Sequence, residues 1–367
     1  MASPLIDLAE IDRILFIKLR HIGDVLLATG VFKAIKTAKP QLQISVVVNA
    51  GTEAMLTLHP SLHEVIPLRK GGSLWEQVAF LYRIRRKRFQ AAVNMTEGDR
   101  GAFLARMTGA RYRVGIDPRG RGFPGKKHLF THLVPQEYDG RHRAVMDMDV
   151  LQPFGLNDGT PHVELFTSPA DDRCVWELLK ERGIDRGTPY LVVHPTSRWL
   201  FKCWRDEAVA RLIDRLEAQG VRTVVTCGPD NREKSKLTRI LSTIRSSPLV
   251  FPGTLSLKQL ASLIKGSALF FGMDSAPMHM AAALGTPVVA LFGPSDRTVW
   301  HPLTAEGRVI VKEDSFPCIP CKKDGCGGSK RSRCLEAVTV DEVMEAIMQV
   351  WRPSSRPEPE IFVPCRS

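Results

Sequence analysis

Short apolar runs alternate with longer segments of helical periodicity along most of the chain, and this alternation is the feature that most constrains its fold. Residues 14–19, 44–48 and 91–94 have the length and mainly apolar composition of buried strands. The chain is expected to turn at Gly23, and residues 24–38 have the spacing of a helix that Pro40 keeps from continuing. Strands that alternate with helices predict a parallel sheet covered on both faces.

The second half of the chain repeats this alternation. Its predicted strands span residues 190–193, 223–226, 250–251, 268–271 and 287–292. The predicted helix over residues 206–219 ends before Gly220 and carries an apolar face made of Val209, Leu212, Ile213 and Leu216. Further helices are predicted from about residue 231, over 257–264 and 277–284, and from residue 339, where Thr339 and Glu342 have capping-box spacing.

Two α/β halves require a join, and loop-type residues between 155 and 173 place it there. We expect an α/β protein with two doubly wound, Rossmann-like domains that face each other across a cleft. The predicted domains are residues 1–165 and 166–350, followed by a mobile tail over residues 351–367. In such sheets ligands bind beyond the carboxyl ends of the strands, which directs attention to the residues that follow each strand.

The charge of the chain favours a polyanionic partner without identifying one. Lys and Arg exceed Asp and Glu by 51 − 39 = 12, which suits nucleic acid, an anionic membrane surface or a phosphorylated substrate. No stretch has the ~18 consecutive apolar residues of a membrane-spanning helix, and the N-terminus lacks the basic segment of a secretory signal. We therefore expect a cytoplasmic protein whose eight cysteines are mostly reduced.

Polar residues gather after the predicted strands of the second half. They occur in three segments, residues 194–204, 227–233 and 272–279, which contain hydroxyls, a lysine, carboxylates and a helix start. Hydroxyls, an ammonium group and free helix-start amides suit a phosphate or diphosphate, and a carboxylate suits ribose or sugar hydroxyls. The motifs G-x-G-x-x-G and G-x-x-x-x-G-K-[ST] are absent at these positions, which disfavours NAD binding and P-loop chemistry.

Three segments in this order resemble the lipopolysaccharide heptosyltransferase family, glycosyltransferase family 9. They are residues 14–27, which contain Gly23-Asp24, then Phe201-Lys202-Cys203-Trp204, and then residues 274–283, which begin Asp274-Ser275-Ala276-Pro277. The resemblance extends from about Arg13 to Val350. Within the family, Pro195-Thr196 and the Ala at position 276, where other subgroups usually have Gly, are most similar to the heptosyltransferase III subgroup.

The resemblance implies a GT-B fold and an inverting transfer of heptose from ADP-L-glycero-D-manno-heptose to a heptose of the lipopolysaccharide inner core, without a metal or other cofactor. The acceptor, a lipid A-linked core, would bind the N-terminal domain, with Asp24 as general base. The donor would bind the C-terminal domain, where Lys202 offsets charge on the departing ADP. The implied donor contacts are Thr196, Ser197, Lys202, Glu233, Asp274, Ser275, Ala276 and His279. An enzyme that uses another nucleotide sugar or core acceptor is the alternative within the family.

Three of these residues also have purely structural interpretations. Asp24 follows Gly23 and could be the N-cap of the helix after it. His279 has apolar helical neighbours and could be a core histidine with satisfied hydrogen bonds. The stem of Lys202 could lie over one of its neighbours Trp199 and Trp204.

Two further motifs bear on metal binding. Asp147-Met148-Asp149 spells the D-x-D of metal-dependent glycosyltransferases, but it lies in a helical pattern where residues i and i+2 face apart, so we reject a metal site there. Four thiols within 17 residues leave a structural zinc site open as a hypothesis. These thiols are Cys318, Cys321, Cys326 and Cys334.

A compact basic run in the N-terminal half also has alternative interpretations. It consists of Arg83, Arg85, Arg86, Lys87 and Arg88 around Ile84. Such a run is usually a solvated face, and docking to the anionic inner face of the inner membrane is the second interpretation. A nucleic-acid-binding module would need aromatic residues interleaved with the charges, and only Tyr82 and Phe89 flank the run, so nucleic acid is not an expected partner.

Overall fold

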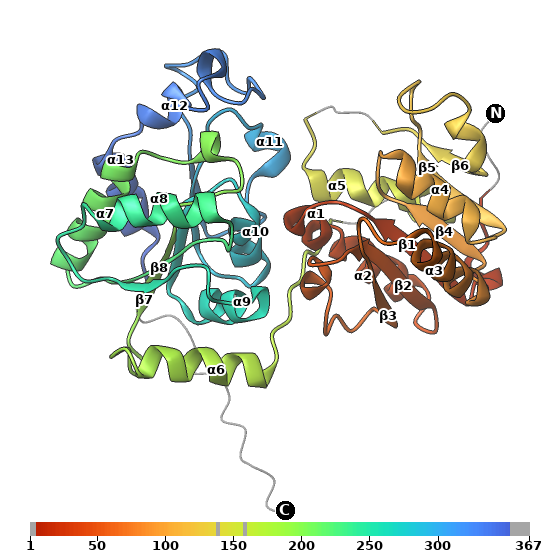
Figure 1. The fold of residues 1–367 in the computed structure, drawn as a ribbon, viewed down its shortest axis with the longest axis horizontal. Helices are drawn as coiled ribbons and strands as arrows, with labels where there is room; N and C mark the ends of the chain where they lie inside the picture. The colour runs from red at the N-terminus through yellow and green to blue at the C-terminus, as the bar shows by residue number, and fades with distance from the viewer. Residues whose placement is uncertain (1–4, 137–139, 157–159, 353–367) are drawn as a thin grey trace, which may run out of the picture. The chain divides into compact units, whose positions relative to one another are not determined.

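The computed structural model describes residues 5–136, 140–156 and 160–352 and divides into two compact units, with the boundary between Phe166 and Thr167. Each unit contains one six-stranded parallel sheet with helices packed against it (Figure 1). This arrangement confirms the predicted fold class. The predicted turn at residues 157–159 and most of the expected tail lie outside the described residues. Within those residues, no helix combines the length and the apolar composition that crossing a membrane requires.

Unit 1, which ends at Phe166, has its first strand in the middle of its sheet. The strand order is β3-β2-β1-β4-β5-β6, and every neighbouring pair is parallel. The strands are β1 (Arg13–Lys18), β2 (Gln43–Asn49), β3 (Glu64–Leu68), β4 (Ala91–Asn94), β5 (Tyr112–Ile116) and β6 (His132–Val134). The helices are α1 (Ile22–Leu27), α2 (Thr29–Ala38), α3 (Leu74–Arg86), α4 (Asp99–Met107) and α5 (Arg143–Met148).

The single helix predicted over residues 24–38 is wrong in two respects. The helix begins before Gly23, at Ile22, and it is broken between α1 and α2. The hydroxyl of Thr29 donates to the carbonyl oxygen of Leu26 at 2.8 Å and accepts from the amide of Glu164 at 3.0 Å. A side-chain hydroxyl that donates to a backbone carbonyl competes with the backbone hydrogen bonds of the helix. Here the amide of Glu164, far along the chain, holds the Thr29 hydroxyl in place.

Unit 2, which begins at Thr167, repeats the topology with the strand order β12-β11-β10-β7-β8-β9. Its strands are β7 (Tyr190–His194), β8 (Arg222–Thr226), β9 (Leu249–Phe251), β10 (Leu269–Met273), β11 (Val288–Leu291) and β12 (Gly307–Ile310). Its helices are α6 (Pro169–Lys180), α7 (Asp206–Ala218), α8 (Asn231–Leu241), α9 (Leu257–Gly266), α10 (Ala276–Ala283), α11 (Arg297–Trp300), α12 (Arg333–Glu336) and α13 (Val340–Val350). The capping box predicted at Thr339 and Glu342 is confirmed at the start of α13.

The loop predicted over residues 168–172 is instead the start of α6. The Ser168 hydroxyl accepts from the amide of Asp171 at 3.0 Å and caps the helix. Pro169 occupies the first helical turn, where a missing amide hydrogen costs nothing. Residues that are typical of loops are therefore also typical of a helix start, which explains the error.

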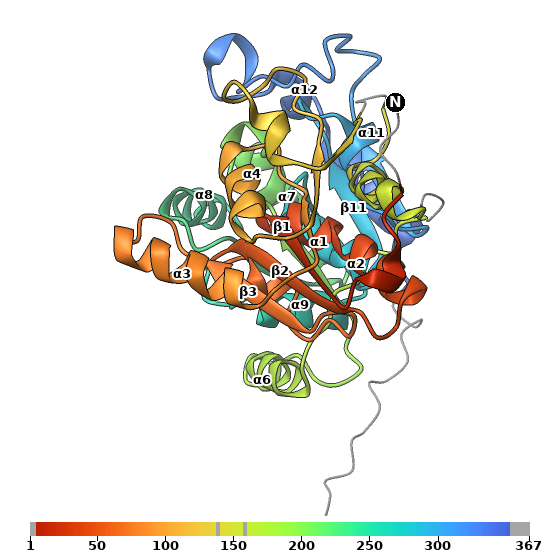
Figure 2. The same cartoon turned by 90° about the vertical axis from the view of Figure 1, so that its right-hand side faces the viewer.

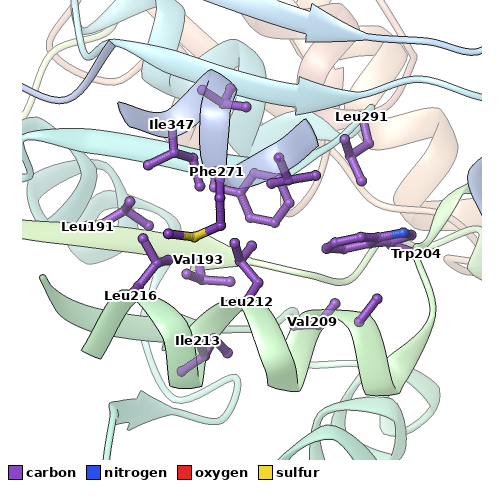
Figure 3. Close-up of a cluster of buried hydrophobic side chains, with 14 of the residues drawn as sticks. Leu191, Val193, Trp204, Val209, Leu212, Ile213, Leu216, Phe271, Leu291 and Ile347 are labelled. Carbon is purple, nitrogen blue, oxygen red and sulfur yellow. The ribbon is translucent and has the colours of Figure 1, made fainter. Parts of the chain in front are cut away.

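The core of unit 2 forms where the predicted apolar face of α7 meets the sheet. Figure 3 shows Val209, Leu212, Ile213 and Leu216 from α7 near Phe271 of β10. Trp204 belongs to the same cluster. Its ring is fully buried, and its indole Nε1 donates a hydrogen bond to the carbonyl of Val338 at 3.1 Å. The helical period seen in the sequence thus corresponds to a real buried face.

This packing predicts that Leu212→Ala destabilises the protein. Leu212 is fully buried, and removal of a buried leucine side chain costs about 2–5 kcal/mol because part of the cavity persists. Met348→Ala on α13 is the control, since this side chain is 44% exposed and should change the free energy of unfolding by no more than about 0.5 kcal/mol. Urea denaturation measures both, and equal effects of the two substitutions would contradict this account of the core.

Candidate functional site

The carboxyl edge of each sheet has a topological switch point beside its first strand. In unit 2 the chain runs from β7 outward through β8 and β9, and then returns to the other side of β7 with β10. In unit 1, β1 and β4 have the same relation. Ligands of open α/β sheets bind at such points because the loops on the two sides diverge there.

Thr196 and Glu233 are joined at this edge of unit 2. Thr196 follows β7, and its hydroxyl donates to Oε2 of Glu233 at 2.6 Å. The amide of Gly228 donates to the same oxygen at 3.1 Å, and a Cβ at Gly228 would lie 2.5 Å from Oε1 of this carboxylate. Among the described residues Oε1 accepts no hydrogen bond, so this oxygen is available to a ligand hydroxyl.

His194 supports this pair and was not among the residues predicted for the site. Its Nδ1 lies 2.9 Å from the hydroxyl of Thr226 and its Nε2 lies 3.4 Å from that of Thr196. Burial lowers the pKa of His194 to about 4, so the ring is neutral at physiological pH. The imidazole therefore orders two hydroxyls without adding charge to the site.

Lys202 and Asp274 form the second pair at this edge. Lys202 Nζ lies 2.6 Å from Oδ2 of Asp274, which directly follows β10, and the lysine side chain remains 24% exposed. The cation over the ring of Trp199 is the guanidinium of Arg198, at 5.3 Å from the centroid, whereas the ammonium of Lys202 is directed to Asp274. The structure thus brings together a lysine and an aspartate that are 72 residues apart in the sequence.

The start of α10 carries a buried hydroxyl that lacks a partner. Ser275 is the N-cap, yet its side chain makes no capping bond, and its Oγ is buried without a hydrogen bond to any described residue. Ala276 is the first helical residue, and His279 lies one turn later, buried, with its ring 6.4 Å from that of Trp300. A buried polar atom without a partner requires an explanation, and an anion at this helix start provides one.

Two further hydroxyls lie in loops that follow strands. Ser197 is buried, and its Oγ accepts from the amide of Trp199 at 3.4 Å. Ser295 follows β11, the neighbour of β10, and its Oγ is buried without a partner among the described residues. Ser295 was not predicted, although it lies three residues after the end of the predicted strand 287–292, in the loop where a strand-end residue would be sought.

Asp24 lies in the first turn of α1, at the switch point of unit 1. The N-cap of this helix is His21, so the interpretation of Asp24 as the cap is wrong. Its carboxylate makes no hydrogen bond to the described residues, although an acid in a first turn still gains from the helix dipole. This arrangement leaves the carboxylate available to a substrate.

A buried ionic network lies beside Asp24. Lys18, at the end of β1, is fully buried with its Nζ 2.6 Å from Oδ2 of Asp147, and Nη2 of Arg143 lies 2.7 Å from Oδ1. Burial lowers the pKa of Lys18, while the carboxylates of Asp147 and Asp24 act in the opposite direction. Asp24 is therefore close enough to the Lys18 ammonium to feel its field.

The two acids of the D-x-D sequence have different partners. Asp147 belongs to the network with Lys18 and Arg143, whereas Asp149 pairs with the guanidinium of Arg141 at 2.9 Å. The side chains at positions i and i+2 thus serve separate ion pairs, as their helical spacing requires.

The cysteine loop between β12 and α12 shows no metal-binding arrangement. Cys318 is exposed, whereas Cys334 is buried, and burial raises the pKa of Cys334 to about 11. Within the residues that the structure describes, no three His, Cys, Asp or Glu side chains are grouped so that they could hold a metal ion. The zinc hypothesis for the four thiols therefore gains no support.

Known proteins resemble this chain in sequence and in structure. A sequence model of glycosyltransferase family 9 (heptosyltransferase) matches residues 78–330. Lipopolysaccharide heptosyltransferase 3 of Escherichia coli (strain K12) is 30% identical over 345 residues, which cover 92% of this chain and 98% of that protein. A solved glycosyl transferase family 9 structure from Veillonella parvula DSM 2008 superposes with a TM-score of 0.81 at 22% identity and covers 95% of this chain and 98% of its own.

A second solved structure places the fold among the GT-B enzymes. The E. coli heptosyltransferase WaaC with ADP-2-deoxy-2-fluoro heptose superposes with a TM-score of 0.68 at 19% identity, and the match covers 92% of this chain and 99% of that chain. At these identities the likeness shows a shared fold. The two parallel α/β sheets of this chain therefore form a GT-B fold.

The neutral state of His194 predicts acid-sensitive stability. In the folded protein burial lowers the pKa of His194 to about 4, whereas a histidine in the unfolded chain has a pKa of about 6.5. Between these values the unfolded state binds more protons, so the free energy of unfolding falls as the pH drops, by up to about 3 kcal/mol from this group. Urea denaturation at a series of pH values measures the slope.

Two variants isolate the contribution of His194. His194→Gln cannot titrate, so its stability should change less between pH 6.5 and pH 4 than that of the native protein. His63→Gln, at an exposed position, should leave the native slope unchanged. A native slope in His194→Gln would show that the buried imidazole does not titrate in this range.

Proposed function

The chain belongs to glycosyltransferase family 9, the heptosyltransferases, and we propose that it transfers heptose from ADP-L-glycero-D-manno-heptose to a heptose of the lipopolysaccharide inner core. The observation that carries the proposal is the set of groups at the carboxyl edge of the unit 2 sheet. There the Lys202–Asp274 pair, the available Oε1 of Glu233 and the unpartnered Oγ of Ser275 follow three neighbouring strands. A cation, a carboxylate and a buried hydroxyl suit the diphosphate, ribose and sugar of such a donor.

We assign the donor contacts as follows. Oε1 of Glu233 accepts from a ribose hydroxyl, while Thr196 holds the carboxylate in place. The diphosphate binds the ammonium of Lys202, the hydroxyl of Ser275 and the first turn of α10. Asp274 contacts the heptose. Ser197, Ala276 and His279 complete the walls of the diphosphate site.

The proposed reaction needs a base for the acceptor hydroxyl and a group that stabilises the departing ADP. The acceptor hydroxyl attacks the anomeric carbon as its bond to the ADP oxygen breaks, and the attack on the opposite face inverts the configuration. Asp24 accepts the proton of the hydroxyl. Lys202 offsets the charge that develops on the departing diphosphate. We assign Lys18 as a positioning residue, because it is held by the ion pair with Asp147 and interacts electrostatically with the carboxylate of Asp24.

The proposed acceptor is the lipid A-linked core, and we assign its binding to unit 1. The relative from E. coli is named lipopolysaccharide heptosyltransferase 3, which supports a core heptose as the acceptor. Because a lipid-linked acceptor is confined to a membrane, the enzyme is proposed to work at the anionic inner face of the inner membrane.

The analysis of the lipopolysaccharide core from cells that lack this protein tests the function as a whole. The proposal predicts a core that is smaller by one heptose in mass spectrometry. Addition of purified protein and ADP-heptose to that core should restore the missing mass. An intact core in the deletion strain, without a second heptosyltransferase to account for it, would contradict the proposal.

The assignment of Asp24 predicts that Asp24→Asn is folded but almost inactive. The amide keeps the shape of the side chain and cannot accept the proton, so turnover should fall by about 10²–10⁴, while the affinity for ADP-heptose and the melting temperature stay close to native. Asp341→Asn, in the first turn of α13, is the control and should retain activity. Full activity of folded Asp24→Asn would exclude Asp24 as the base, and activity lost only in proportion to unfolding would make its role structural.

The assignment of Lys202 predicts weaker donor binding in Lys202→Ala. A charge-assisted contact is worth roughly 1.5–3 kcal/mol, so the Kd for ADP-heptose in titration calorimetry should rise roughly 10- to 100-fold. Lys265→Ala removes a comparable ion pair, with Asp172 at 3.0 Å, and should leave the Kd unchanged. Equal affinities of Lys202→Ala and the native protein would sink the assignment.

A further inference from the structure

Helix α3 of unit 1 carries an apolar stripe that no other part of the described chain covers. The stripe consists of Leu74, Trp75, Val78 and Tyr82, with exposed fractions of 74%, 83%, 49% and 63%. At about 100° per residue these four positions fall within roughly one quarter to one third of the helix circumference. They therefore form one continuous face.

A different face of α3 holds the helix to unit 1. Ile84 is its one buried residue, and Phe80 and Leu81 pack partly buried against the unit 1 core. The neighbouring helix α4 (Figure 2) also exposes two apolar side chains, Phe103 and Met107, of which Phe103 stacks on Phe123. Single exposed apolar side chains are normal on protein surfaces, whereas several that lie together, as on the α3 stripe, mark an interaction surface.

The charges around the stripe are mainly positive. Arg83, Arg85, Arg86 and Arg88 make no ion pair with the described residues, whereas Lys87 of the basic run is paired with Glu64 at 2.7 Å. The one acid of α3, Glu76, is occupied in the capping box with Ser73. The guanidinium of Arg86 lies over the ring of Tyr82, 5.6 Å from its centroid, so charge and aromatic surface are adjacent.

We propose that α3 is the membrane anchor of this protein, with its stripe inserted at the boundary between headgroups and acyl chains of an anionic bilayer. Tryptophan and tyrosine beside arginine are typical of helices that lie in this interface. The arginines bind lipid phosphates, which are complementary to the unpaired guanidinium groups. A protein partner fits less well, since a stable interface needs about 800 Å² on each side, more than four side chains of one outward-facing helix offer.

The biological role of this anchor rests on the proposed function, because docking by α3 would bring the enzyme to a lipid-linked acceptor. The position of the anchor on α3 rests on the structure alone. Lys87 was expected to share in electrostatic docking, but its ion pair with Glu64 removes it from the set. The stripe on α3 adds exposed aromatic and aliphatic side chains to the contacts that the basic run alone could make.

Vesicle binding by two sets of variants tests the anchor. With vesicles of phosphatidylethanolamine and phosphatidylglycerol, the combined Trp75→Ser, Val78→Ser and Tyr82→Ser variant should lose at least tenfold in binding, as should Arg83→Gln, Arg86→Gln and Arg88→Gln together. Met348→Ser and the combined Lys180→Gln, Arg308→Gln and Lys323→Gln variant are the controls, at exposed positions of unit 2, and should bind as the native protein does. Native binding by the serine variant would overturn the proposal.

A fluorescence experiment locates the contact. Lipids brominated in the acyl chain quench a tryptophan that enters the bilayer interface, and this quenching should disappear in Trp75→Phe while vesicle binding persists. Quenching that remains in Trp75→Phe would place the contact elsewhere. Retention on oligonucleotides in place of vesicles, or a dimer that the serine substitutions dissociate while vesicle binding stays native, would replace the membrane with another partner.

Failure of the anchor can be distinguished from failure of the proposed function. Transfer to a delipidated, water-soluble core oligosaccharide needs no membrane, so the serine variant should retain native turnover on it. A native protein that binds vesicles through α3 but transfers no heptose would refute the function alone. A protein that transfers heptose and ignores vesicles would refute the anchor alone.

Discussion

The position of the first strand in each sheet is the constraint on which the candidate sites depend. β1 and β7 are central strands, and in both units the chain extends the sheet to one side before it returns to the other. Because all strands are parallel, every loop that follows a strand emerges at the same edge. Residues that are far apart in sequence, such as Lys202 and Asp274, therefore meet beside the first strand, and Asp24 takes the corresponding position in the other unit.

The alternation of apolar runs was sufficient to predict two parallel α/β sheets, and the three motifs were sufficient for the family. The sheets could be predicted because burial on two faces and helical period are visible in short stretches of sequence, whereas the family rested on the resemblance of the motifs. The prediction failed where a distant contact decides the local structure. The break at Thr29 depends on Glu164, and the helix start at Ser168 uses residues that are equally typical of a loop.

The candidate site could be predicted only as a set of separate residues. The strand-end rule selected Thr196, Glu233 and Asp274, but it could not show that Thr196 occupies one oxygen of Glu233 and leaves the other available. It included His194 in a candidate segment without giving it a role, because the neutral state of this histidine follows only from the burial that the fold imposes. Pairing and burial are properties of the packed chain, and no periodicity in the sequence encodes them.

Two lysine–aspartate pairs in this protein have the same geometry and different environments, and this difference bears on what each can do. Both Nζ–Oδ2 distances are 2.6 Å, but Lys18 and Asp147 are 0% and 1% exposed, whereas Lys202 and Asp274 are 24% and 7% exposed. Separation of a fully buried pair leaves two desolvated charges, at a cost of several kcal/mol, so Lys18 cannot change partners during a reaction. A pair with access to solvent pays much less to open, because water and a ligand phosphate can replace the carboxylate. The buried pair is thus suited to hold a constant field beside Asp24, and the accessible pair is suited to exchange Asp274 for an incoming diphosphate.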